Sequence, residues 1–358
     1  MTLKVEPREE IMPVDVNGLA AFIASIQSES GEIPWSKGGK TDPWDHVESA
    51  MGLTVAGCHG EARRAYGWLA ATQQQDGSWF SGLRDGRIED DTRESNFAAY
   101  PAVGLFHYFL VTGDRAFLQN MWPMIEAGIG FALGLQAPSG EIFWARNRAG
   151  AIDPMALLTG SCSIYMSLKC ALAVAALLGE ERPAWGKAME KLEYAIRNLP
   201  HHFNMIKSRF SMDWYYPILC GAVSGPEARM RIDKGWEKFA VPGWGIRCVS
   251  DRPWVTMAET AELVLSLAAI DAYEDAETVF NWLADKRYED GAYWMGVTFP
   301  DAVVWPDEET TWTAAAVILA YDALNDLTPG GRLFHHGFWG GQGKDPARIA
   351  QRFAALHR

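Results

Sequence analysis

The sequence predicts an all-α protein, an (α/α)6 toroid built from six helical hairpins. The clearest sign is a stretch that occurs three times, as QSESGEIPW from Gln27 to Trp35, QQDGSW from Gln74 to Trp79 and QAPSGEIFW from Gln136 to Trp144. A looser fourth copy, YEDGAYW, ends at Trp294. Each copy follows an apolar helical segment, and recurrence at roughly 50 to 60 residues marks a structural unit that is used repeatedly.

Two kinds of helix alternate along the chain. The first helix of each hairpin has spaced apolar residues and is expected to be amphipathic, over 14–28, 60–75, 115–136, 182–198, 226–240 and 273–287. The second is apolar almost all round, at Ser49 to Ala56, Phe97 to Val111, Pro154 to Leu178, Ala258 to Ile270 and Thr313 to Leu324. Because a helix without a polar face is buried on all sides, outer helices are expected to surround inner ones.

The connections differ in length according to their direction. Links from an inner to an outer helix are tight and often marked by glycine, at Gly57, Gly113 and Gly179, whereas the opposite links are long. Long loops on one rim of a rigid scaffold usually carry binding and catalysis, so the amino-terminal ends of the inner helices are expected to surround the site. The fourth hairpin, in HHFNMIKSRFSMDWYYPIL, lacks the Gly-Trp signature, and a five-hairpin toroid with an irregular insert is the alternative.

Length and charge bound the class of protein. No Pro/Ser-rich or charged linker interrupts the 358 residues, so 1–358 is predicted to be a single domain. The repeats would occupy about 14–325, and a carboxyl-terminal extension over 326–358 would cover the cup or pack outside it. The net charge of −13 argues against nucleic acid or an anionic membrane surface as a partner.

The remaining composition gives expectations about location and cofactors. The amino-terminal MTLKVEPREE lacks an apolar h-region, and the Ala/Leu run from Ala171 to Leu178 is far shorter than the roughly 20 apolar residues of a spanning helix. We therefore expect no membrane span and a cytoplasmic location. Five scattered cysteines, with no H-E-x-x-H, Walker A or G-x-G-x-x-G motif, predict neither disulfides nor a metal or cofactor site.

Acidic residues gather where the inner helices begin, in TDPWDHVE, EDDTRESN, AIDP, MDWYY, TMAET and PDEET. Some of them are expected to be helix caps, namely Asp42, Asp91, Asp153, Asp213 and Asp307, together with Thr256 in a T-x-x-E capping box. Others are left over, namely Asp45, Glu48, Glu94, Glu259 and Glu309. An unpaired carboxylate in a core is costly, so these side chains are expected to point into a shared cup unless they lie on an outward face.

Aromatic and basic residues share the same loops. Flat aromatic faces beside carboxylates suit two ligand classes, which are sugar rings and carbocations. The residues expected to bind substrate are Trp44, His46, Trp79, Arg84, Asp90, Trp144, Arg146, Asp213, Tyr215, Trp244, Arg247, Trp254 and Trp305. For several of them a structural role is the alternative, since Trp79 and Trp144 could wedge a loop between hairpins, and His46 could be a buried structural histidine.

The Q-x3-G-x-W elements resemble the QW repeats of the terpenoid cyclase and protein prenyltransferase superfamily, best in YGWLAATQQQDGSW from Tyr66 to Trp79. The (α/α)6 glycosidases and related sugar enzymes are similar in the same way. The resemblance implies a toroidal architecture more than an activity. The proton-donating D-x-D-D of class II cyclases has its nearest match at Ile88 to Thr92, where isoleucine replaces the first aspartate, and no Asp/Cys/His zinc triad of the prenyltransferases can be assembled.

The sequence therefore predicts a carbohydrate-active enzyme, most simply an inverting glycoside hydrolase acting on an oligosaccharide or glycoconjugate. One carboxylic acid would protonate the leaving oxygen and a second would activate water, at a separation of about 6.5–9.5 Å. The candidates are Asp45, Asp91 and Glu94 on one side of the cup and Glu259 and Glu309 on the other. An isoprenoid enzyme with Asp90 and Asp91 as proton donors is the first alternative, and a non-catalytic glycan-binding toroid is the second.

Overall fold

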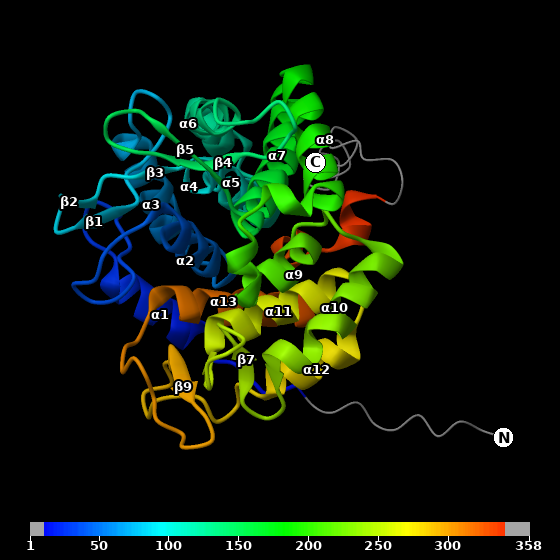
Figure 1. Cartoon of the computed structure of the whole chain (residues 1–358). Coiled ribbons are helices and arrows are strands. Elements are labelled where there is room, and N and C mark those ends of the chain that lie inside the picture. Colours follow the sequence, from blue (N-terminus) through cyan, green and yellow to red (C-terminus); the bar gives the residue numbers. More distant parts are fainter. Residues whose placement is uncertain (1–10, 341–358) are drawn as a thin grey trace.

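Helices form two layers in the structure, a computed structural model that describes residues 11–340. Within these residues the inner layer consists of α2 (Pro43–Val55), α4 (Ser95–Ala99) with α5 (Pro101–Thr112), α7 (Leu158–Leu178), α9 (Met212–Leu219), α11 (Met257–Ala269) and α13 (Thr311–Asn325). The outer layer consists of α1 (Val16–Ile26), α3 (His59–Thr72), α6 (Arg115–Leu133), α8 (Pro183–Asn198), α10 (Gly225–Phe239) and α12 (Tyr273–Asn281). Figure 1 shows the first set around the centre and the second set outside it.

The inner helices contact one another in a closed circuit. Each of α2, α5, α7, α9, α11 and α13 packs against the next, and α13 returns to pack against α2. This last contact is close because Gly52 has no side chain, and a β-carbon there would lie 3.1 Å from the Cα atom of Ala315. Every residue of α2 and α11 is buried, and so are most of those of α13, as the lack of a polar face in these segments predicts.

The sequence repeat is a clamp between neighbouring hairpins. The side-chain amides of Gln27, Gln73 and Gln136 each donate to the carbonyl of the glycine four residues later and to a carbonyl of the next hairpin's outer helix. Those glycines, Gly31, Gly77 and Gly140, have φ of +98°, +89° and +112°. A β-carbon on any of them would lie 2.1–2.3 Å from a carbonyl oxygen of that helix. Glycine is therefore required twice, for its conformation and for the close approach.

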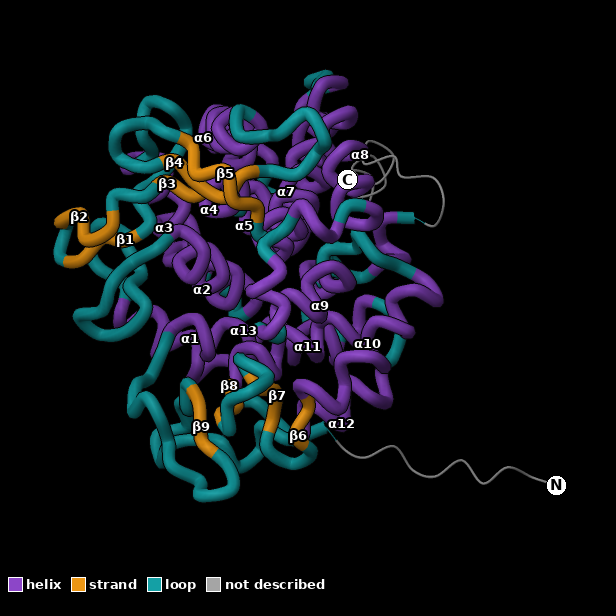
Figure 2. Tube along the Cα trace, in the orientation of Figure 1, coloured by secondary structure: helices purple, strands orange, loops and turns teal. Residues whose placement is uncertain are grey.

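Strands occupy four of the long connections. The chain is therefore mostly helical, whereas the sequence predicted an all-α protein. One sheet pairs β1 (Gly82–Arg84) with β2 (Arg87–Asp90). A second has the order β3 (Arg93–Glu94), β4 (Phe143–Arg146), β5 (Ile152–Ala156). A third has the order β6 (Ala240–Val241), β7 (Gly245–Arg247), β8 (Trp254–Thr256), β9 (Gly296–Thr298). All paired strands are antiparallel. Figure 2 shows these strands among the loops outside the inner helices.

Some predicted helix ends are confirmed and others are wrong. Asp42 caps α2 by accepting from the amide of Asp45, and Gly113 and Gly179 end α5 and α7 in the left-handed conformation, as predicted. Asp153 lies in β5 and caps no helix, because its segment pairs with β4. Thr310, instead of Asp307, caps α13.

The weakly predicted fourth hairpin is present as α8 and α9. Helix α9 has only eight residues, and two 3-10 turns, η1 (Pro200–His202) and η2 (Met205–Arg209), precede it. The predicted six hairpins thus describe the helices better than five with an insert.

Helix α7 is the one described helix that is long and apolar enough to cross a membrane. Most of its side chains are buried against α5, α8 and α9 within the fold. A core helix meets the same criteria of length and composition, so α7 is weak grounds for a membrane span.

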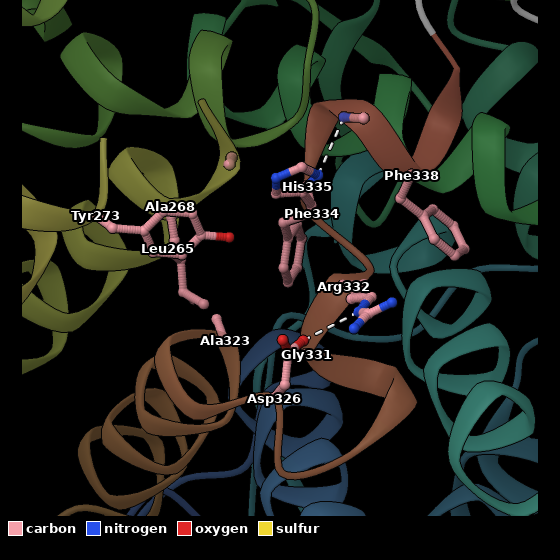
Figure 3. Close-up of a pocket in the computed structure, with 12 residues that line it drawn as sticks. Leu265, Ala268, Tyr273, Ala323, Asp326, Gly331, Arg332, Phe334, His335 and Phe338 are labelled. Atoms are coloured by element: carbon pink, nitrogen blue, oxygen red, sulfur yellow. Dashed lines mark hydrogen bonds and ion pairs between the residues drawn. The ribbon is translucent and has the colours of Figure 1, made fainter. Parts of the chain in front are cut away.

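The chain after α13 packs across the carboxyl-terminal ends of the inner helices, away from the long connections. The 3-10 turns η3 (Pro329–Arg332) and η4 (His336–Trp339) lie here, and the His336 ring bonds the Ile218 carbonyl at the end of α9. A cavity of about 410 Å³ separates this segment from α11, α12 and α13, with Tyr273, Phe334 and Phe338 in its wall (Figure 3). The described part of the predicted extension therefore does not cover the cup; residues 341–358 lie outside the described range.

The glutamine clamp gives a first testable prediction. Replacing Gln73 with alanine removes both hydrogen bonds of its amide and should lower the free energy of unfolding by about 1–3 kcal/mol. Gln74→Ala is the matched control, because the neighbouring amide donates only to the Thr72 carbonyl within its own turn. Urea unfolding of both variants checks the expectation, and equal losses in the two would show that the clamp is not what joins the hairpins.

Candidate active site

A cavity of about 310 Å³ opens where the inner helices begin. The walls come from the first turns of α2, α4, α7, α9 and α13 and from the connections that lead into them. The residues lining it are Trp35, Asp42, Trp44, Asp45, Glu94, Asn96, Phe97, Leu157, Thr159, Gly160, Lys207, Phe210, Met212, Asp213 and Trp312. The predicted location of the site is therefore occupied by a cavity that combines acids with aromatic rings.

Asp45 differs from the other acids of this cavity because one of its buried carboxylate oxygens lacks a hydrogen-bond partner among the described residues. It is buried in the first turn of α2, and this oxygen is Oδ2. Burial raises the pKa of Asp45 well above its ordinary value, and the negative charges of Asp42 and Glu48 raise it further. Asp45 is thus placed to hold a proton and to offer it to a ligand in the cavity.

The other cavity acids are held in different ways. Asp42 is fixed as the cap of α2 and lies 3.5 Å from the ammonium group of Lys40. Asp213 accepts two hydrogen bonds from Thr159, one from the amide at 3.2 Å and one from the hydroxyl at 2.7 Å. Burial raises the pKa of Glu94 to about 7, against a lowering hydrogen bond from Ser81, and the charges of Asp42 and Asp90 also raise it. Glu94 therefore titrates near neutral pH.

A second layer of buried acids lies beneath the cavity. Glu48 accepts hydrogen bonds from the Trp44 indole at 2.9 Å and from the Tyr100 hydroxyl at 2.8 Å. Glu262 of α11 accepts from the Tyr216 hydroxyl at 2.7 Å and from the Tyr215 hydroxyl. Burial raises the pKa of Glu48 to about 7 and that of Glu262 well above its ordinary value.

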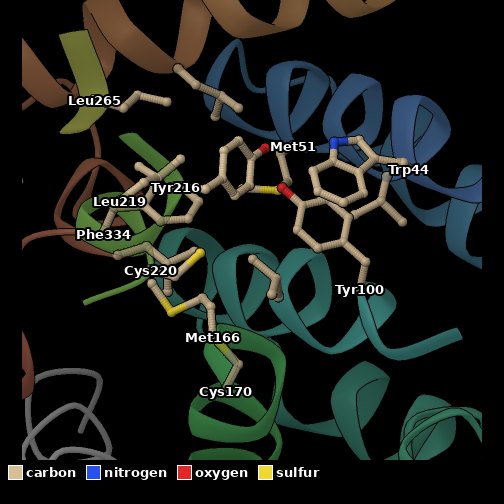
Figure 4. Packing of buried hydrophobic residues seen from close by; sticks show 14 of the residues in the cluster. Trp44, Met51, Tyr100, Met166, Cys170, Tyr216, Leu219, Cys220, Leu265 and Phe334 are labelled. Atoms are coloured by element: carbon tan, nitrogen blue, oxygen red, sulfur yellow. The ribbon is translucent and has the colours of Figure 1, made fainter. Parts of the chain in front are cut away.

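Aromatic stacking joins this layer to the cavity wall. The Trp44 and Tyr100 rings stack at 4.7 Å between centroids, and Trp44 lies 5.6 Å from the Tyr216 ring. Figure 4 shows the three rings gathered on one side of Met166 and Cys220. Hydrogen bonds to buried carboxyl groups and ring stacking therefore fix the indole that faces the ligand.

Glu259 lies in the first turn of α11, between α9 and α13 in the ring. Its Oε2 atom is buried and has no partner in the described part of the chain, although the Cys248 thiol bonds the carboxyl group. The negative charge of Glu259 contributes to a raised pKa at Tyr215, after burial and Glu262. Glu259 is not among the residues lining the cavity, although α9 and α13, the neighbours of α11 in the ring, both contribute to its wall.

Several other predicted residues lie outside this cavity. Asp91 faces the Arg148 guanidinium at 3.7 Å in an exposed notch, and Asp90 accepts from the amide of Thr92. Arg84 pairs with exposed Glu89. Glu309 forms an isolated antiparallel β-bridge with Trp294 in the connection before α13. Burial raises the pKa of Glu309, and the negative charges of Asp290 and Asp307 raise it further. No contact of these four supports a role at the cavity, so their roles stay predictions.

His46 and Trp79 have structural contacts. The His46 ring is fully buried, accepts from the Ile33 amide at 3.1 Å and bonds the Ala65 carbonyl at 3.0 Å. Burial lowers the pKa of His46 to about 4, against these hydrogen bonds, so the ring stays neutral. The Trp79 indole donates to the Leu69 carbonyl and wedges the loop against α3. These contacts fit the structural role that the sequence analysis gave as the alternative for both residues.

Most of the remaining predicted binding residues lie in or beside two of the sheets, and Tyr215 lies in α9. Trp144 and Arg146 lie on β4, where Arg146 stands over the Phe131 ring. Trp244, Arg247, Trp254 and Trp305 surround β7–β9, with Arg247 over Phe299 and the Trp254 indole donating to the Trp305 carbonyl. Tyr215 is buried beneath the cavity as a donor to Glu262. These residues do not line the cavity itself.

Sequence reasoning missed several cavity residues. Trp312, Phe97, Phe210 and Lys207 were not among the predicted binding residues, although all line the cavity. Trp312 follows the Thr310 cap by two residues, the same offset as Trp44 from Asp42, and this parallel was a usable signal. Lys207 and Phe210 lie in and just after η2, which has no helical or strand periodicity. In residues 11–340, no cluster of three or more His, Cys, Asp or Glu side chains could hold a metal ion.

Comparison with solved structures first identifies the fold. The fold matches a glycosidase solved with glucose, at a TM-score of 0.67 and 14% identity over 88% of this chain and 96% of that one. It also matches a D-mannose isomerase at 0.66 and a sugar epimerase from a ruminal bacterium at 0.63, each at 12% identity. These likenesses show the fold alone. No protein-family model matches the chain.

A closer relative defines the family. The chain is 50% identical, over 324 residues, to the MMP endo-(1,4)-3-O-methyl-alpha-D-mannosidase of Mycolicibacterium hassiacum, and the match covers 90% of both chains. The chain therefore belongs to the family of this endo-mannosidase. The predicted class, a glycoside hydrolase, is confirmed. The resemblance to terpenoid cyclases is not shown by these matches, and the isoprenoid alternative is not favoured.

The buried acid beneath the cavity gives a second prediction, about pH. Because the pKa of Glu48 is about 7 in the folded protein and 4.5 ordinarily, its contribution to stability is fully present below about 4.5 and is lost as pH rises through about 7. This loss amounts to as much as about 3 kcal/mol. Glu48→Gln should therefore lose less stability than the parent protein between pH 5 and pH 8 in urea unfolding. Parallel losses would show that Glu48 does not carry this dependence.

Proposed function

We propose that this protein hydrolyses internal α-(1,4) linkages in a chain of 3-O-methyl-D-mannose, with inversion at the anomeric carbon, in a six-hairpin α/α toroid. The substrate class is taken from the name of the 50% identical relative. The cavity supports a sugar ligand because Asp45, Glu94 and Asp213 alternate with Trp44 and Trp312 in its wall. Carboxylates bind hydroxyl groups, and indole faces stack on the CH face of a pyranose ring.

One observation carries the mechanism. Asp45 and Glu259 lie in the first turns of α2 and α11, the two inner helices on either side of α13, and each has a buried carboxylate oxygen without a partner in residues 11–340. A buried polar atom without a partner is costly, so a bound ligand or water is the natural partner of both oxygens. Glu48 and Glu262 differ in this respect: Glu48 Oε1 accepts from the Trp44 indole and the Tyr100 hydroxyl, and each oxygen of Glu262 accepts from a tyrosine hydroxyl.

The roles of the two residues follow from their surroundings. Asp45 has a raised pKa and so is the acid, which protonates the glycosidic oxygen as the bond to the anomeric carbon breaks. Glu259 is the base, which removes a proton from a water molecule as that water attacks the opposite face of the sugar. Asp213 and Glu94 bind ring hydroxyls, and Trp44 and Trp312 hold the sugar by stacking. After turnover Glu259 carries the proton and Asp45 the negative charge, and exchange with water restores both.

Isosteric variants test these roles. Asp45→Asn and Glu259→Gln should each lower kcat on an α-(1,4)-linked 3-O-methylmannose oligosaccharide by at least about a thousandfold, because each loses its proton-transfer function. Asp91→Asn is the control, since that carboxylate pairs with Arg148 outside the cavity, and it should keep kcat within about threefold. Unfolding curves of all three should confirm that they fold. Full activity in either catalytic variant would exclude that residue from the reaction.

The stereochemical outcome is a separate prediction. Inversion of an α-linked substrate releases the β-anomer first, because water attacks the face opposite the leaving group. Proton NMR of the early reaction should show the β-anomeric signal before mutarotation produces the α-anomer. An α-anomer formed first would indicate retention and a carboxylate nucleophile in place of an activated water.

A further inference from the structure

Large apolar side chains are exposed at one end of the molecule. Of the described residues, six such side chains in the long connections are between 42% and 75% exposed. We call them the apolar rim: Ile88, Ile152, Met205, Ile206, Val303 and Trp305. They lie in the four connections that lead into α4, α7, α9 and α13. Each of these connections or the helix after it also supplies residues to the cavity wall, so the rim belongs to the end of the ring at which the cavity opens.

Local contacts hold parts of the rim in place, and one part adjoins the cavity wall. Ile206, which is 75% exposed, directly precedes Lys207 of the wall, and the amide of Asn204 donates to the carbonyl of Ala156, just before Leu157 of the wall. On the α13 side, the Trp305 ring lies 5.4 Å from the Trp254 ring, and the Trp254 indole donates to the Trp305 carbonyl. The rim side chains are thus carried by ordered backbone.

The position of these residues is informative because single exposed apolar side chains are ordinary, whereas their concentration around a site mouth points to a ligand. The ligand proposed for the cavity has an apolar group on each unit, since a 3-O-methyl ether replaces a hydroxyl group by a methyl-capped oxygen. An unmethylated sugar chain would leave Ile, Val and Met side chains facing hydroxyl groups that bind water. A methylated chain would bury its methyl groups against them.

We propose that the apolar rim is the binding surface for the methyl ethers of sugar units that extend beyond the cavity, and that it selects an O-methylated chain over an unmethylated one. This inference rests on the proposed function. It assigns the endo character to a surface: on both sides of the cleaved bond, further units of the chain extend beyond the 310 Å³ cavity and contact the rim. The preference for methyl groups would then increase with chain length, because longer chains reach more of the rim.

Binding to an inactive enzyme tests the proposal. In the Asp45→Asn background, calorimetry would measure Kd for two chains of equal length, one of α-(1,4)-linked 3-O-methyl-D-mannose and one of α-(1,4)-linked D-mannose. The rim variant carries Ile88→Ser, Met205→Ser and Ile206→Ser. The matched control carries Tyr194→Ser and Met230→Ser on α8 and α10, where these side chains are 58% and 53% exposed.

The rim variant should raise Kd for the methylated chain about fivefold to tenfold more than for the unmethylated chain, since a buried methyl group contributes roughly a factor of four. It should also reduce the size of the negative heat-capacity change on binding, the marker of apolar burial. The control should change neither quantity. A rim variant that behaves like the control, or that weakens both chains equally, would overturn the inference.

Failure of the proposed function has a different signature. If the parent protein neither binds nor cleaves the methylated chain, the substrate class is wrong and the role of the rim falls with it. If the parent cleaves the methylated chain while rim and control variants bind alike, the proposed function stands and only the rim assignment is overturned.

Discussion

The constraint on which the rest of the structure depends is the presence of buried carboxyl groups around one end of a closed ring of helices. An ionised carboxylate away from water is costly unless it is paired or takes up a proton. Asp42 has Lys40 as a partner, and Asp213 has two hydrogen bonds from Thr159. Burial raises the pKa values of Asp45, Glu94 and Asp213, in the last case against the hydrogen bonds from Thr159, so part of the cost is met by protonation. Such a ring supplies proton donors near neutral pH, which acid catalysis on a glycosidic bond requires.

The ring explains how these groups are kept in place. Inner helices buried on all sides cannot rotate to expose an acid, because rotation would also disturb their contacts with both neighbours. The contact of Gly52 with Ala315 joins the last inner helix to the first, and the glutamine clamps at Gly31, Gly77 and Gly140 join successive hairpins. The positions of Asp45 on α2 and Glu259 on α11 are therefore set by the whole circuit, although α2 and α11 are far apart in the sequence.

Much of this arrangement could be predicted from the sequence because it has local, periodic signals. Apolar segments without a polar face predicted the inner helices, and the recurring glutamine and glycine predicted the repeat. The clamping glutamine of the second copy is Gln73, one residue before the start assigned from the sequence, because spacing to Gly77 and not composition decides which amide reaches the next helix. Asp45, Glu94, Asp213 and Trp44, all named from the sequence, line the cavity because each lies at or just after the start of an inner helix.

What the sequence did not predict depends on contacts between distant segments. The strands, including β5 at the expected cap Asp153, form because antiparallel partners lie beside them. The partner comes from the same connection for β5 and from another connection for β3 and β9, and the two to five residues of each strand show no clear alternation. Glu48 and Glu262 could not be told from the cavity acids, because the phenols and indole that bind them come from Tyr100, Tyr215, Tyr216 and Trp44. Lys207 and Phe210 reach the cavity from an irregular segment.

A structure of the Asp45→Asn variant with an α-(1,4)-linked 3-O-methylmannose chain tests the central claim, that two carboxyl groups with free oxygens meet across the scissile bond. The account predicts that the glycosidic oxygen lies within hydrogen-bonding distance of the substituted amide. It also predicts a water molecule held by Glu259 on the opposite face of the same sugar unit. A chain bound with Glu259 directed away from it, or bound instead in the cavity beside Tyr273 and Phe338, would contradict the account.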